Sequence, residues 1–166
     1  MKKPIKFVLA IILCFAASAI GSIFTVSSIP SWYSTLIKPS FNPPNWIFGP
    51  VWTILYFLMA ITLYLIWTKK KNVQAERWFY LQLILNAAWS VIFFGLHQPL
   101  IAFIIIILLW LSILATIFWA RKTTKTGAYL MIPYILWVTF ASVLNLMLVI
   151  LNWFRSLKSQ FSFIIC

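Results

Sequence analysis

Acidic and histidine side chains are almost absent from this sequence. Its 166 residues include one carboxylate, Glu76, and one histidine, His97, beside two cysteines, Cys14 and Cys166. General acid–base catalysis and metal binding usually need several such groups close together. We therefore predict no metal site and no cofactor, expect His97 to be a turn residue rather than a haem ligand, and leave open whether the protein is an enzyme.

Charge of either sign is also scarce. Charged residues make up 8% of the chain and hydrophobic residues 64%, whereas soluble domains carry about 25% charged residues. Four stretches contain no charge at all: residues 7–37, 39–68, 78–120 and 126–154. A membrane-spanning helix needs about 20 apolar residues, so the third stretch is long enough for two spans. Gly95 to Pro99 is its natural break, since glycine and proline interrupt helices.

The pattern predicts an all-α integral membrane protein, a five-transmembrane-helix bundle forming one domain over residues 1–154. The expected spans are about 5–28, 44–67, 77–95, 99–119 and 127–153, followed by a C-terminal tail at 155–166. The first apolar run also resembles a signal peptide, with a small-residue pattern at Ala17-Ser18-Ala19. Because the run continues to Val26, beyond the length of a signal core, we retain it as the first span.

The net charge of +12 does not indicate a nucleic-acid-binding surface, because Lys and Arg are placed as signals of membrane topology. They cluster at the ends of apolar runs, and no basic face is available to follow a phosphate backbone. Five spans would place ten of the thirteen on the N-terminal side and three on the other. The excess of Lys and Arg marks the cytoplasmic side. We expect a multi-pass protein of the bacterial cell membrane, with its N-terminus cytoplasmic and its C-terminus outside.

Polar and indole side chains within the expected spans indicate an internal site. One helical face carries Gln82, Asn86 and Trp89, and another carries Trp137 and Ala141. Polar side chains in spans also bond neighbouring helices, and this alternative stays open. Indoles at mid-span are less readily explained, because belt tryptophans lie at the interfaces. Pro133 frees a backbone carbonyl and bends its helix near Trp137, which favours a cavity.

Three ordered blocks resemble the tryptophan-rich sensory protein/translocator protein (TspO/MBR) family. The first block runs from Trp32 to Tyr56, the second is LNAAWSVIFFGLHQP, and the third is PYILWVTFASVLN. The matching residues are Trp32-Tyr33, Leu36, Lys38-Pro39-Ser40, Pro43-Pro44, Gly49-Pro50-Val51-Trp52, Leu55-Tyr56, Leu85-Asn86, Ala88-Trp89, Phe93-Phe94-Gly95, Gln98, Pro133-Tyr134, Trp137, Phe140-Ala141 and Leu144-Asn145.

The resemblance implies a ligand pocket that opens toward the first loop, with that loop as its lid. The implied ligands are flat and apolar: protoporphyrin IX and other tetrapyrroles, and benzodiazepine-type compounds. The implied ligand-binding residues, with two neighbours added, are Trp52, Trp137, Ala141, Trp89, Asn86, Tyr56 and Lys38. Lys38 is expected to pair with a porphyrin carboxylate, or else simply marks the interface.

The sequence departs from the family pattern at two places, and the roles of those family residues are not assigned to this chain. Many members have an acidic residue in the fourth helix, where this chain has Ile104 to Ile107. The sterol motif of animal members is missing, and the generic pattern of Leu58, Tyr64 and Lys69 is weak evidence. We therefore predict no specific sterol binding. The family resemblance also suggests a homodimer, although Ala87, Ala88 and Gly95 serve equally well for packing inside one bundle.

Three functions remain. The first is a tetrapyrrole-binding receptor, sensor or carrier in the membrane. The second is a light-dependent porphyrin-degrading photo-oxidase that uses the same pocket, with Trp52 and Trp137 as candidate catalytic residues. The third is a structural protein with a vestigial pocket. The bilayer is the one partner expected in all three.

Reporter fusions test the expected topology. Fusions at Lys70 and at Cys166 should report opposite sides of the membrane, with Lys70 cytoplasmic, because three expected spans separate these two residues. The measurement is the activity of a reporter that works on one side only, compared with a reporter that works on the other. If both fusions report the same side, the five-span model is wrong, most simply because the stretch at 78–120 is divided wrongly.

Overall fold

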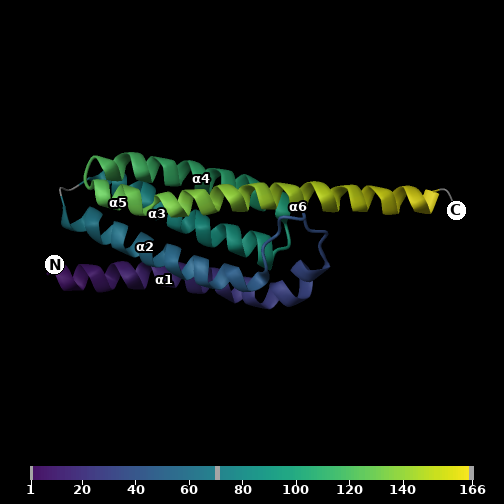
Figure 1. Cartoon of the computed structure of the whole chain (residues 1–166), viewed down its shortest axis with the longest axis horizontal. Coiled ribbons are helices and arrows are strands. Elements are labelled where there is room, and N and C mark those ends of the chain that lie inside the picture. The colour runs from purple at the N-terminus through teal and green to yellow at the C-terminus, as the bar shows by residue number, and fades with distance from the viewer. Residues whose placement is uncertain (1, 70–71, 165–166) are drawn as a thin grey trace.

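The computed structural model describes residues 2–69 and 72–164, with side chains up to Trp153. Helices run side by side, and the start of α1 and the end of α6 lie at opposite ends of the bundle (Figure 1). The helices are α1 (Lys3–Ser28), α2 (Phe48–Thr68), α3 (Val73–Ser90), α4 (Pro99–Arg121), α5 (Lys125–Leu130) and α6 (Ile132–Ile164). Five helical stretches are long and apolar enough to cross a membrane, which confirms the fold class.

Small residues bring α1 close to the rest of the bundle. Ala10, Cys14, Ala17 and Gly21 are buried along one face of α1, at the spacing of successive helical turns. A side-chain carbon added at Gly21 would lie 3.2 Å from Cβ of Ser90 on α3. The hydroxyl of Ser90 donates to the Gly21 carbonyl at 2.9 Å. Close approach of this kind is how membrane helices pack without a hydrophobic driving force.

Two π-helical turns extend the helices beside the loop end of the bundle. The first, Ile29–Tyr33, continues α1, and the second, Val91–Gly95, continues α3. Such turns add a residue to the helical repeat and shift the face that later side chains occupy. They bring Tyr33, Phe93 and Phe94 into one buried aromatic cluster.

The fifth span is broken at Met131, between α5 and α6. Pro133 has no backbone N–H, so it cannot bond to the carbonyl of Tyr129. Before the break, α5 packs against both α2 and α4. After it, α6 follows α4, and its helix contact with α2 is slight. The ribbons of α2 and α6 separate toward the loop end (Figure 1).

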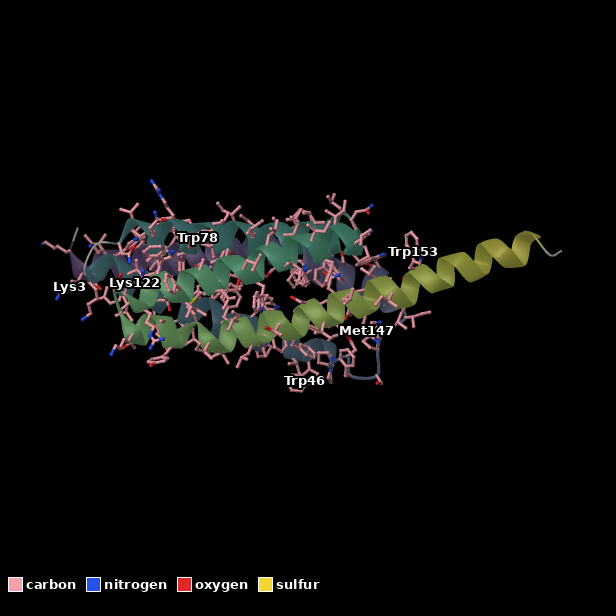
Figure 2. The ribbon with its side chains drawn as sticks, turned by 90° about the horizontal axis from the view of Figure 1, so that it is seen from above. Lys3, Trp46, Trp78, Lys122, Met147 and Trp153 are labelled. Carbon is pink, nitrogen blue, oxygen red and sulfur yellow. The ribbon has the colours of Figure 1, made fainter. Side chains whose placement is uncertain are left out.

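The loop at residues 34–44 is fastened to α6 and to its own start. The side-chain amide of Asn152 donates to the Ile37 carbonyl at 3.1 Å, and its oxygen accepts from the Ile37 N–H at 3.0 Å. The hydroxyl of Tyr33 donates to the side-chain oxygen of Asn42 at 2.6 Å. A 3-10 turn, Asn45–Ile47, then leads into α2 directly after the two prolines. Figure 2 shows Trp46 and Trp153 toward this end of the molecule, and Lys3 and Lys122 at the other.

The first and last helical stretches are longer than the expected spans. Helical structure continues beyond the first expected span to Tyr33, and α6 continues through the expected tail to Ile164; residues 165–166 lie outside the described residues. Gly95 packs against Phe24 of the same chain. The homodimer therefore stays a prediction, and Gly95 is already used within one bundle.

Gly95→Ala should destabilise the bundle. Its new carbon would stand 2.6 Å from the ring of Phe24, and overpacking of this kind costs about 1–3 kcal/mol of unfolding free energy. Gly49→Ala is the matched control, because nothing lies within 4 Å of a carbon added there. Thermal unfolding in detergent should show a lower Tm for Gly95→Ala and an unchanged or slightly higher Tm for Gly49→Ala. Equal Tm values would contradict the packing of α1 on the turn after α3.

Candidate ligand-binding site

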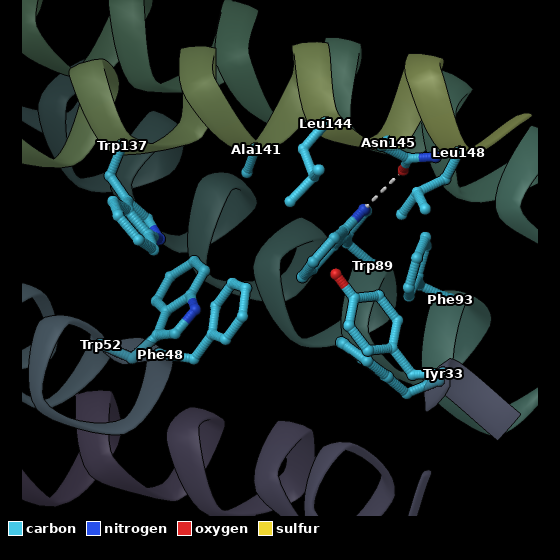
Figure 3. Close-up of a pocket in the computed structure, with 11 residues that line it drawn as sticks. Tyr33, Phe48, Trp52, Trp89, Phe93, Trp137, Ala141, Leu144, Asn145 and Leu148 are labelled. Atoms are coloured by element: carbon cyan, nitrogen blue, oxygen red, sulfur yellow. Dashed lines mark hydrogen bonds between the residues drawn. The ribbon is translucent and has the colours of Figure 1, made fainter. Parts of the chain in front are cut away.

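A cavity lies between α2, α3 and α6, at the level where α6 has left α2. Its volume is about 360 Å³ including the open mouth. Figure 3 shows side chains from α6 on one side and from α2 and the first π-helical turn on the other, with Trp89 between them. The lining residues are Tyr33, Phe48, Trp52, Trp89, Phe93, Phe94, Trp137, Ala141, Leu144, Asn145 and Leu148.

Aromatic rings form most of this wall. Trp89 and Phe93 are stacked with ring centres 5.4 Å apart. Phe48 meets Trp137 edge to face at 6.1 Å. Ala141, beside Trp137 on α6, leaves room because its side chain is a single methyl group. The arrangement offers flat apolar faces with few polar atoms, which is the usual chemistry of small-molecule sites.

Some polar side-chain atoms at the cavity have hydrogen-bond partners and one does not. The indole N–H of Trp89 donates to the side-chain oxygen of Asn145 at 3.1 Å. The Asn145 amide in turn donates to the carbonyl of Pro99 at 2.8 Å. The indole nitrogen of Trp137 is buried and has no hydrogen-bond partner. A buried N–H without a partner costs free energy, so Trp137 presents an unused donor beside the cavity.

Asn86 lies beneath the cavity, in a polar cluster that joins three helices. The hydroxyl of Tyr56 on α2 donates to its side-chain oxygen. Its amide donates to the hydroxyl of Tyr134 on α6 at 2.8 Å. The rings of Tyr56 and Tyr134 lie 5.7 and 6.2 Å from that of Trp52, which lines the cavity above them. Asn86 therefore holds α2, α3 and α6 together under Trp52.

The structure brings together four of the residues expected at the site. Trp52, Trp89, Trp137 and Ala141 line the cavity, whereas Asn86, Tyr56 and Lys38 do not. The ammonium of Lys38 lies 4.9 Å from the centre of the Tyr33 ring, so one aromatic side chain separates it from the cavity.

The structure adds seven lining residues to the expected set. Leu144 and Leu148 continue the helical spacing of Trp137 and Ala141, and that periodicity is a signal for both. Phe93 and Asn145 likewise follow Trp89 and Ala141 at helical spacing. Tyr33, Phe48 and Phe94 come from the π-helical turns or the start of α2, where periodicity gives no signal. The seven are Tyr33, Phe48, Phe93, Phe94, Leu144, Asn145 and Leu148.

Ionisable groups do not gather at the cavity. Among the described residues, no three His, Cys, Asp or Glu side chains come close enough to hold a metal ion. The lining consists of aromatic rings, aliphatic side chains and one amide. Any chemistry at this site therefore depends on ring faces, indole donors and what the ligand itself supplies.

The chain is similar to known membrane proteins over most of its length. Residues 10–151 match the TspO/MBR family. The tryptophan-rich protein TspO of Archaeoglobus fulgidus is 41% identical, covering 89% of this chain and 97% of the relative. The protein of the same name from Chlorobaculum tepidum is 40% identical, with 91% and 98% covered. The human translocator protein is 37% identical, with 76% and 78% covered.

Asn86→Leu should destabilise the bundle by about 1–3 kcal/mol, because it leaves the hydroxyls of Tyr56 and Tyr134 buried without this partner. Adding Tyr56→Phe and Tyr134→Phe should recover most of the loss, since the unpaired groups are then gone. Unfolding of the single and triple variants in detergent measures this difference. If Asn86→Leu unfolds like the wild type but loses ligand binding, Asn86 contacts ligand and is not a structural centre.

Proposed function

The chain belongs to the TspO/MBR family, and on this premise we propose that it is a membrane receptor, sensor or carrier that binds a tetrapyrrole such as protoporphyrin IX. The observation that carries the proposal is the unused indole N–H of Trp137 beside a cavity walled by aromatic rings. The rings supply flat apolar contact, and the N–H supplies one directional bond to an acceptor on the ligand.

A flat macrocycle suits the orientation of the side chains. Trp52 and Trp137 approach the cavity from opposite helices (Figure 3), so a planar ligand between α2 and α6 contacts both indoles. The space of about 360 Å³ includes the open mouth, so the enclosed part of the cavity is too small for a whole macrocycle. Binding of a tetrapyrrole therefore widens the space between α2 and α6.

Lys38 supplies a positive charge close to the ligand. Its ammonium lies over Tyr33, whose ring lines the cavity. A propionate of protoporphyrin that extends toward the loop would meet this charge, and the pair is worth at most about 1 kcal/mol where water reaches it. In the proposed orientation the loop is outside the cell, the N-terminus is cytoplasmic, and the membrane is that of a bacterial cell. Benzodiazepine-type ligands are a further proposal for the same rings.

A second candidate function is light-dependent oxidation of the bound porphyrin. The observation that favours it is the contact of Trp52 with Tyr56 and Tyr134, which places oxidisable rings in sequence behind the cavity. Light excites the porphyrin, oxygen accepts the electrons that the porphyrin loses, and Trp52 and Trp137 hold the macrocycle in the cavity during this reaction. The absence of acid–base groups does not exclude this reaction, because no proton transfer from a side chain starts it.

Illumination of the purified protein with protoporphyrin IX in air separates these functions. A dark sample and free porphyrin in detergent are the controls. Binding without a protein-dependent product supports a receptor, sensor or carrier. A defined product that forms only with protein and light supports the photo-oxidase. If the protein binds no porphyrin, the proposal fails and a structural role remains.

Trp137→Phe and Trp52→Phe should each weaken porphyrin binding by about 1–2 kcal/mol, which is roughly 5- to 30-fold in Kd, from lost ring area and the lost N–H. Trp119→Phe is the control, because Trp119 does not line the cavity and contacts Lys122 at the opposite end of the bundle. Ligand titration and thermal unfolding are measured side by side. Variants that lose stability but bind normally would identify Trp52 and Trp137 as packing residues only.

A further inference from the structure

The exposure of the lining residues shows where the cavity opens. Its loop-end wall is closed: Tyr33, Phe93, Asn145 and Leu148 are 1–2% exposed. Five lining residues are half-buried instead. One of them, Trp89, lies between the two sides of the cavity (Figure 3). The other four lie on α2 and α6 and form the rim: Phe48, Trp52, Trp137 and Ala141. The mouth therefore lies in the seam between α2 and α6.

Few contacts close this seam. α2 packs closely against α1 and α5, and α6 against α4, but backbone packing between α2 and α6 is slight. Two aromatic contacts span the gap. Phe48 meets Trp137 edge to face at the mouth, with ring centres 6.1 Å apart. Trp52 meets Tyr134 beneath it at 6.2 Å. One aromatic pair of this kind is readily displaced by rotation of its side chains, because it carries no hydrogen bond and no main-chain contact.

The loop end is closed far more firmly than the seam. Asn152 makes two hydrogen bonds to the main chain of Ile37, and Tyr33 bonds to Asn42. The loop residue Phe41 also packs edge to face on Phe140 of α6. Access through the loop breaks these contacts together. Access through the seam at the level of Phe48 separates the rings of Phe48 and Trp137 and leaves the contact of Trp52 with Tyr134 in place.

The seam faces hydrocarbon rather than water. On α2, Ile54 and Phe57 are 60% and 46% exposed, and on α6, Leu136 and Val143 are 64% and 49% exposed. These side chains lie on the outward faces of the two helices, at the depth of the rim residues and inside the apolar spans. A flat apolar molecule dissolved in the bilayer can therefore pass from acyl chains to ring faces without crossing water.

We propose that ligand reaches the cavity sideways from the bilayer, through the seam between α2 and α6, with Phe48 and Trp137 as a movable gate. The occupant is a flat, membrane-dissolved tetrapyrrole, so the proposal rests on the proposed function for its ligand. The loop at 34–44 is then a fixed end wall of the site, and acyl chains of neighbouring lipids reach the gate when no ligand is there.

Photo-crosslinking tests the seam without any porphyrin. Benzoylphenylalanine placed at Phe48 in native-like nanodiscs should capture a lipid acyl chain under ultraviolet light, detected by mass spectrometry of the protein. The same substitution at the lipid-facing Phe57 is the positive control, and at the buried Phe79 the negative control. Capture at Phe57 but none at Phe48 overturns the proposal, because lipid then does not reach the gate.

Binding kinetics test the route itself. Nanodiscs loaded with protoporphyrin dimethyl ester are mixed with protein nanodiscs, and quenching of tryptophan fluorescence is followed. Phe48→Ala should raise both the association and the dissociation rate by about 2- to 10-fold, the factor that one aromatic pair implies. Asn152→Ala, which frees the loop, should leave both rates within about twofold.

Three outcomes decide between the routes. Faster association in Asn152→Ala with no change in Phe48→Ala assigns access to the loop and overturns the seam. Slower association with faster dissociation in Phe48→Ala makes Phe48 a wall contact only, which also overturns the gate. Absence of quenching in the wild-type protein is a failure of the proposed function, and the crosslinking result still decides whether the seam is open to lipid.

Discussion

The interrupted hydrogen-bond ladder between α5 and α6 determines where the cavity lies. Pro133 cannot bond to Tyr129, and the chain turns at Met131 before α6 begins. The short α5 stays against α2, but α6 continues along α4 and leaves α2. An uninterrupted helix along the direction of α5 would stay beside α2. One missing N–H in a span thus separates two helices and creates space lined by rings.

Hydrocarbon offers no hydrogen bonds, so the polar side chains inside the spans must find partners within the protein. Asn86 serves two tyrosines, and Asn145 joins Trp89 to the carbonyl of Pro99. Among the described residues, two buried side-chain atoms have no partner: the oxygen of Gln82 and the indole nitrogen of Trp137. Gln82 does not line the cavity, so its oxygen costs stability only. The unpaired nitrogen at the cavity is the one that a ligand can satisfy.

The sequence predicted the five spans because charge-free length is a direct consequence of bilayer thickness. It also predicted the bend at Pro133 and four lining residues, since helical spacing links Trp137 to Ala141 and the family resemblance supplied Trp52 and Trp89. It missed Tyr33, which lies in a π-helical turn that changes the repeat on which spacing arguments depend. Phe93 follows Trp89 at helical spacing but was not expected at the site. Asn86 and Tyr56 share a face with lining residues, but their depth depends on helix crossing angles that one sequence does not specify.

The clamp between Asn152 and Ile37 has a consequence for how the protein is made. The two residues are 115 positions apart, and the ribosome synthesises Asn152 after all but the end of the last span. The loop at 34–44 is therefore without this fastening while α2 to α5 enter the membrane. Its final arrangement depends on insertion of the last helix, so a chain truncated before Asn152 contains every cavity-lining residue and yet lacks the contact that fixes the loop above them. The loop therefore reaches its final arrangement only after most of the last span has been synthesised.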